Sequence, residues 1–222
     1  MAKIFLEQTD YNTNKTPRLP ICICIDSSNM VSEMNLVEIG AFINDLSTHI
    51  LNNIECAAKV QFCIVTFAEK PEVISDFKAV DGTPLSLKSV DQQPNLDAAL
   101  KKCADLFNAQ IDTYRKKGIS YYLPELLLLS SGISTTDITE TASRLCAAQN
   151  SKYLSVMPFK IGEGTTAELE KLTESKKVYT IEYKDFSKLF DCMKSSIELL
   201  SASSAAARNS LESQMVGWEQ FF

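Results

Sequence analysis

An unbroken apolar segment near the start of the chain limits the available folds more than any other feature. Residues 19–25 read Leu-Pro-Ile-Cys-Ile-Cys-Ile, and the run stops at Asp26, which is followed by two serines. Isoleucines alternate with cysteines, so both faces of an extended segment are apolar, as in a central strand of a parallel sheet. Asp26 is then expected at the carboxyl edge of that sheet, where open α/β folds place their ligand sites.

The rest of the chain alternates between apolar stripes with helical spacing and short apolar runs typical of strands. Strands are predicted at residues 59–67, 71–77, 121–129, 153–159 and 178–181, and helices at 36–50, 96–111, 138–146, 167–172 and 186–200. The short gap after residue 67 favours a hairpin and therefore an antiparallel edge strand. The predicted fold class is α/β: a doubly wound, Rossmann-like, mostly parallel sheet with one antiparallel edge strand and helices on both faces.

Composition bounds the size and the environment of this fold. The 222 residues are 45% hydrophobic and carry a net charge of −6, which fits one large domain and argues against a surface for nucleic acid or an anionic membrane. The seven cysteines lack the paired spacing of a zinc site and are predicted to be buried thiols in a reducing compartment. No run has membrane-spanning length and no signal-peptide pattern is seen, so the expected localisation is cytoplasmic.

Several short motifs, in order along the chain, resemble landmarks of the von Willebrand factor A family. Asp26-Ser-Ser-Asn-Met30 is similar to the Asp-x-Ser-x-Ser motif of that family, and Leu-Leu-Ser-Ser-Gly at 128–132 is similar to the segment that carries its Thr-Asp-Gly. Phe-Ser-Lys-Leu-Phe at 186–190 and Ser-Ala-Ser-Ser at 201–204 resemble the bacterial TerY-like type, associated with tellurium resistance. The resemblance implies a von Willebrand factor A domain at 18–203. The polar residues 1–17 before it are interpreted as an N-terminal arm, and residues 204–222 after it as a C-terminal amphipathic tail.

In metal-binding members of this family, the Asp-x-Ser-x-Ser motif, a threonine and a second aspartate hold Mg²⁺ at a metal-ion-dependent adhesion site. Mg²⁺ prefers an octahedron of oxygen ligands, and here Met30, Pro94 and Ser131 stand at three of the family positions. A thioether is a poor ligand for a hard cation, and the motifs keep one carboxylate in place of two. We therefore expect a degenerate site without a cofactor. If Mg²⁺ binding persists, the ligand oxygens would come from Asp26, Ser28, Asn95 and Ser131.

Two other interpretations concern single residues. Asp26 and Ser28 can also act locally, because short polar side chains satisfy backbone donors in turns before helices. A hydrolase would need a general base, and His49 is the only histidine. It lies late in an amphipathic helix beside apolar residues, as a surface or boundary histidine does. The chain is therefore predicted not to be an enzyme.

The end of the chain carries a second candidate binding segment. Leu211, Met215, Trp218 and Phe222 fall at offsets of 4, 7 and 11, with Phe221 beside them. This pattern fits a short amphipathic helix that docks in a groove, either of a partner or of its own domain.

The predicted function is a non-enzymatic protein-interaction adaptor of the TerY-like type in a bacterial stress-response or phage-defence system. The resemblance implies a protein kinase or a PP2C-type phosphatase as partner. The alternative is a Mg²⁺-dependent ligand-binding domain or a chelatase-like accessory subunit. The predicted partner-binding residues lie at the carboxyl edge of the sheet and in the tail: Asp26, Ser27, Ser28, Asn29, Met30, Pro94, Asn95, Ser131, Gly132, Trp218, Phe221 and Phe222.

Overall fold

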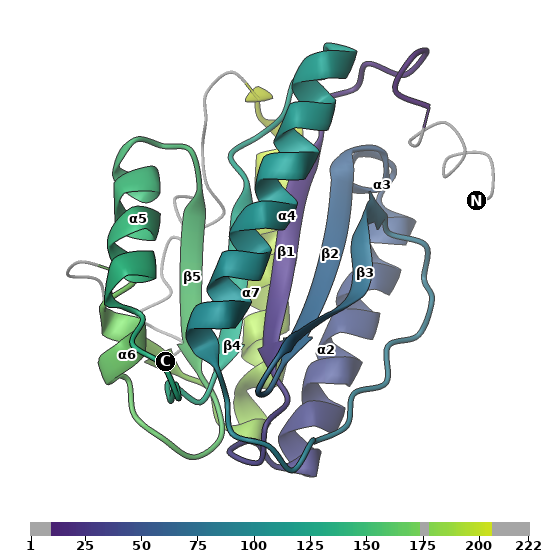
Figure 1. Cartoon of the computed structure of the whole chain (residues 1–222). Helices are drawn as coiled ribbons and strands as arrows, with labels where there is room; N and C mark the ends of the chain where they lie inside the picture. Colours follow the sequence, from purple (N-terminus) through teal and green to yellow (C-terminus); the bar gives the residue numbers. More distant parts are fainter. Residues whose placement is uncertain (1–9, 174–177, 206–222) are drawn as a thin grey trace.

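The computed structural model describes residues 10–173 and 178–205, and in these ranges a six-stranded sheet lies between two layers of helices (Figure 1). The sheet order is β3-β2-β1-β4-β5-β6. Neighbouring strands pair in parallel except β2 and β3, which pair antiparallel, so β3 is the antiparallel edge strand. The predicted fold class is confirmed. The strands are β1 (Leu19–Asp26), β2 (Val60–Phe67), β3 (Pro71–Ala79), β4 (Glu125–Ser130), β5 (Ser155–Lys160) and β6 (Tyr179–Thr180).

Strand β1 is central because both of its faces are apolar. All eight of its residues are buried, and it pairs with β2 on one side and with β4 on the other. Ile21, Ile23 and Ile25 belong to the core on one face of the sheet. Cys22 and Cys24 belong to the core on the opposite face, as the two-residue period of a strand requires.

The helices divide between these two cores. One layer holds α2 (Glu33–Asn52), α3 (Ile54–Lys59) and α7 (Phe186–Ala202). Helix α7 follows the 3₁₀ turn η1 (Tyr183–Asp185). The other holds α4 (Leu96–Lys117), α5 (Thr139–Asn150) and α6 (Ala167–Glu170). Local signals set several ends: Ser32 accepts a hydrogen bond from Asn35 N at the start of α2, and Gly118, with φ of 63°, ends α4.

Two departures from the predicted elements have local causes. The strand expected from Tyr121 begins only at Glu125, because Pro124 has no N–H to donate, and Tyr121 forms just an isolated bridge with Arg18. The strand expected from residue 59 is preceded by α3, which was not predicted. The side chain of Asn53 caps this helix by accepting hydrogen bonds from the backbone N–H groups of Glu55 and Cys56. A helix of six residues is too short to produce a recognisable helical spacing of apolar residues.

The predicted burial of the cysteines is confirmed, because all seven are buried free thiols. Over residues 10–173 and 178–205, none of the helices combines the length and the apolar character that a membrane crossing needs.

Candidate functional site

The carboxylate of Asp26 forms hydrogen bonds with both loops that follow the adjacent strands β1 and β4. Its Oδ1 accepts a hydrogen bond from Ser28 N at 3.0 Å. Its Oδ2 accepts from both Ser131 N at 2.9 Å and Ser131 Oγ at 2.5 Å. Asp26, Ser28 and Ser131 are all fully buried. The sheet edge therefore brings the predicted residues together, with the carboxylate already bonded on both oxygens by its own chain.

The loop after β1 is held on its other side by the end of β2 and by residues 89–92. Ser27 N donates to Phe67 O at 2.8 Å, and Ser27 O accepts from Val90 N at 2.7 Å. Asn29 N donates to Gln92 O at 3.1 Å. The contribution of residues 89–92 was not predicted, because a polar connection without periodicity carries no sequence signal for its position.

Asn95 lies at this edge as a helix cap. Its N–H donates to Ala68 O at 2.8 Å, and its Oδ1 accepts from Ala98 N at 3.0 Å and from Thr136 Oγ1 at 2.8 Å. Pro94 O accepts from Thr135 N at 2.9 Å. The side-chain oxygen of Asn95 thus has two donors from its own chain, one at the start of α4 and one in the loop before α5.

The loop after β5 completes the edge, and sequence reasoning missed it. Met30 O accepts from Glu163 N at 3.0 Å. Gly162 has φ of +62°, and a Cβ at this position would lie 2.5 Å from Met30 O. Glycine is needed here for both its backbone conformation and its lack of a side chain, so the Gly-Glu-Gly sequence at 162–164 was the available signal.

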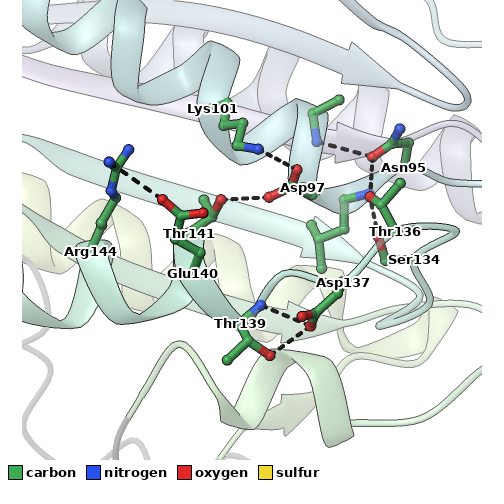
Figure 2. Close-up of polar contacts among 12 residues, drawn as sticks. Asn95, Asp97, Lys101, Ser134, Thr136, Asp137, Thr139, Glu140, Thr141 and Arg144 are labelled. Atoms are coloured by element: carbon green, nitrogen blue, oxygen red, sulfur yellow. Dashed lines mark hydrogen bonds and ion pairs between the residues drawn. The ribbon is translucent and has the colours of Figure 1, made fainter.

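A polar network joins the start of α4 to α5 and to the loop between β4 and α5 (Figure 2). In that loop, Ser134 Oγ accepts from Leu96 N at 3.1 Å, and Thr136 Oγ1 donates to Asn95. The carboxylate of Asp97 accepts from Lys101 Nζ at 2.7 Å and from Thr141 Oγ1. Burial raises the pKa of Asp97, but the hydrogen bonds from Lys101 and Thr141 outweigh it and hold this pKa below its ordinary value. Asp97 is therefore an ionised link between the first turns of two helices.

The predicted site residues differ in how far they reach the surface. Asn29 is exposed, and Met30 and Asn95 are half-buried. The other predicted residues in the described ranges are buried, and they shape the edge from beneath: Asp26, Ser27, Ser28, Pro94, Ser131 and Gly132. Asn29 and Met30 also line a polar cavity of about 490 Å³, with Lys160, Glu163 and Glu182 among its other walls. Trp218, Phe221 and Phe222 lie outside the described residues.

The carboxyl edge of the sheet offers few of the ligand groups that a metal ion requires. In the part of the chain that the structure describes, no three His, Cys, Asp or Glu side chains lie close enough together to hold a metal ion. The hydroxyl of Ser131, at the family's second aspartate position, donates to Asp26. Met30, at the second serine position, offers a thioether in place of an oxygen.

His49 lies far from this edge. It is sixteen positions along α2 from Glu33, which corresponds to about 24 Å of helix. Its Nε2 is 2.8 Å from Glu198 Oε1, and its ring packs edge-on to Phe190 at a centroid distance of 6.4 Å. His49 therefore contacts α7 and no residue of the site.

Comparisons with known proteins agree with this architecture. Proximal thread matrix protein 1 from the mussel byssus has a TM-score of 0.56 at 17% identity, over 85% of this chain and 47% of that one. A von Willebrand factor type A protein from Catenulispora acidiphila has a TM-score of 0.56 at 15% identity, over 82% and 43%. Manganese-loaded TRAP protein from Plasmodium vivax has a TM-score of 0.55 at 11% identity, over 78% and 73%.

At these identities the similarity concerns the fold, and the chain spans less than half the length of the first two structures. No curated protein matches the chain significantly. The model of the von Willebrand factor type A domain family, however, matches residues 21–194, which is most of the sequence. The chain belongs to the von Willebrand factor type A domain family.

Proposed function

We propose that this chain is a non-enzymatic interaction module that binds a protein partner through the carboxyl edge of its sheet, without a metal ion. Von Willebrand factor type A domains generally act as protein-interaction modules. The observation that carries the proposal is the internal bonding of Asp26: three donors of its own chain already bind its two carboxylate oxygens. Binding here then depends on the shape of the loops and on the side chains they expose.

The residues present do not fit a Mg²⁺ site. A cation would have to displace the Ser131 hydroxyl from Asp26 and compete with the helix-capping bonds of Asn95. It would gain one carboxylate, whereas affinity for hard cations depends strongly on the number of charged ligands. The rival function is a Mg²⁺-dependent ligand receptor or chelatase-like subunit. It requires Mg²⁺ to replace the Ser131 hydroxyl on Asp26 and the hydrogen-bond donors on Asn95.

Titration calorimetry with Mg²⁺ and with Mn²⁺ tests the absence of a cation site. The expected result is no saturable heat for either ion at millimolar concentrations. Asp26→Ala provides the comparison, because both proteins should give the same traces. Saturable binding to the natural chain that disappears in Asp26→Ala would establish the rival function.

The partner surface proposed here is formed by the exposed and half-buried residues of the edge: Asn29, Met30 and Asn95. The motifs at 186–190 and 201–204 support assignment to the TerY-like type, working in the cytoplasm in a stress or phage-defence system. A protein kinase or a PP2C-type phosphatase is the partner class that this type implies.

Co-purification with the full chain as bait, followed by mass spectrometry, tests this surface. Asn29→Arg should lower capture of the principal partner about tenfold or more, because a bulky cation replaces a small amide on the contact surface. Asn52→Arg is the matched control, since Asn52 is exposed at the opposite end of α2. Capture should survive a chelator. Partner loss in the chelator, or equal capture by both variants, would contradict the proposal.

A further inference from the structure

A large groove is lined by residues of both α4 and α5. These two helices lie on the face of the sheet that also carries α6 (Figure 1). Its volume is about 990 Å³, at the upper end for a small-molecule pocket. The walls carry apolar side chains from both helices and from the segments before β4 and β5, namely Phe107, Ile111, Tyr121, Leu145 and Leu154. It extends towards the amino end of the strands, away from the candidate site, and the proposed function does not use it.

The path of the chain after α7 leads directly to this groove. Helix α7 packs on the opposite face of the sheet and ends at Ala202. The hydroxyl of Tyr122 then donates to Ser203 O at 2.8 Å, which holds the chain beside the amino end of β4. Ser204 and Ala205, the last described residues, already line the groove. The described part of the chain therefore ends at the groove.

We propose that residues 206–222 dock in this groove of their own domain. The segment has the apolar spacing of an amphipathic helix, ending in Trp218, Phe221 and Phe222. Seventeen residues in a helix would span about 26 Å, whereas the groove-lining part of α4, from Lys101 to Arg115, spans about 21 Å. The segment is thus long enough to fill the groove without leaving its point of attachment.

The charges of the groove and of residues 206–222 are complementary, which favours this segment as the occupant of the groove. The groove is lined by four cationic side chains and two carboxylates, in a protein whose net charge is −6: Lys101, Arg115, Arg144, Lys152, Asp105 and Asp112. The segment carries Glu212 and Glu219 against one arginine. Lys101 pairs with the largely buried Asp97. Arg115 and Arg144 pair with carboxylates of their own helices, but these two pairs are exposed and weak, so both arginines can exchange partners.

Trp218 is the only tryptophan, so its fluorescence in the full chain reports directly on this docking. The expected result is emission at shorter wavelength than that of a peptide of residues 206–222, together with severalfold weaker quenching by acrylamide. Ala148→Glu and Ala104→Glu each place a carboxylate in one wall of the groove and should restore peptide-like emission. Ala147→Glu and Ala109→Glu are the matched controls, because these alanines are exposed on the same helices outside the groove.

Each other outcome overturns the proposal. Exposed Trp218 in the natural chain would show that the segment is free. Protection that survives both groove variants would place the segment elsewhere. Protection that disappears on dilution, with a dimer in sedimentation velocity, would make a second copy the occupant. Circular dichroism confirms that each variant is folded, and the two groove variants on separate helices guard against a local packing defect. Binding at the carboxyl edge does not enter this experiment.

Discussion

Replacing Gly132 by alanine is expected to lower the free energy of unfolding by about 3 kcal/mol or more. Gly132 has φ of +73°, which an L-residue adopts only with strain. A Cβ at this position would also lie 1.8 Å from Thr165 O, a backbone atom that cannot rotate away. The loop that carries Ser131 would have to separate from the loop after β5. Urea unfolding followed by far-ultraviolet circular dichroism measures the loss.

Gly118→Ala separates the two causes. Gly118 has a similar φ of +63°, but a Cβ there would meet no atom within 4 Å. This variant should lose only the conformational term, about 1 kcal/mol. Equal losses at the two positions would show that the close approach of the loops at Gly132 does not contribute.

The second large effect is expected for Asp26→Asn, at about 3 kcal/mol of unfolding free energy. The carboxylate accepts on both oxygens, whereas an asparagine has one acceptor oxygen and must turn its amide donors towards Ser28 N or Ser131. A buried donor is then left without a partner. Ser131→Ala removes only the hydroxyl donor and should cost about 1 kcal/mol. The measurement is again urea unfolding.

The control for Asp26 is Asp112→Asn. Asp112 is 61% exposed and lies 3.8 Å from Arg115, so the change should stay within about 0.5 kcal/mol. The metal hypothesis predicts a different pattern: Mg²⁺ would raise the melting temperature of the natural chain, and Asp26→Asn would remove that increase. Indifference of the natural chain to both Mg²⁺ and chelator is the outcome consistent with a structural Asp26.

The central strand and the meeting of Asp26 with Ser131 could be predicted, because parallel strands that are apolar on both faces must lie inside the sheet and end at one edge. The orientation of the Ser131 hydroxyl could not be predicted. A serine in such a loop can face either solvent or the buried carboxylate, and the neighbouring loops decide which. Residues 89–92 illustrate the same limit. Val90 and Gln92 bond the loop after β1 through their backbone groups, and Ser89 and Asp91 bond it through their side chains, but the polar sequence of this segment does not indicate where it lies.

The burial of Ser27 and Ser28 also departs from what their polarity suggests. Ser28 is fully buried, because backbone N–H groups at the end of β1 need acceptors and its hydroxyl accepts from Met30 N at 3.3 Å. Sequence reasoning identified these serines by their motif. The local hydrogen-bonding role that was predicted for Ser28 is the one its hydroxyl has, whereas its complete burial follows from the packing of the loops around it.

The hydrogen bonds that close the loops around Asp26 have a consequence for the kinetics of association. Loops fixed by their own chain have little conformational entropy left to lose in a complex. A partner therefore meets loops of fixed conformation at any concentration of divalent ions. Its association rate should then be governed by collision and orientation, with no slow loop rearrangement in between.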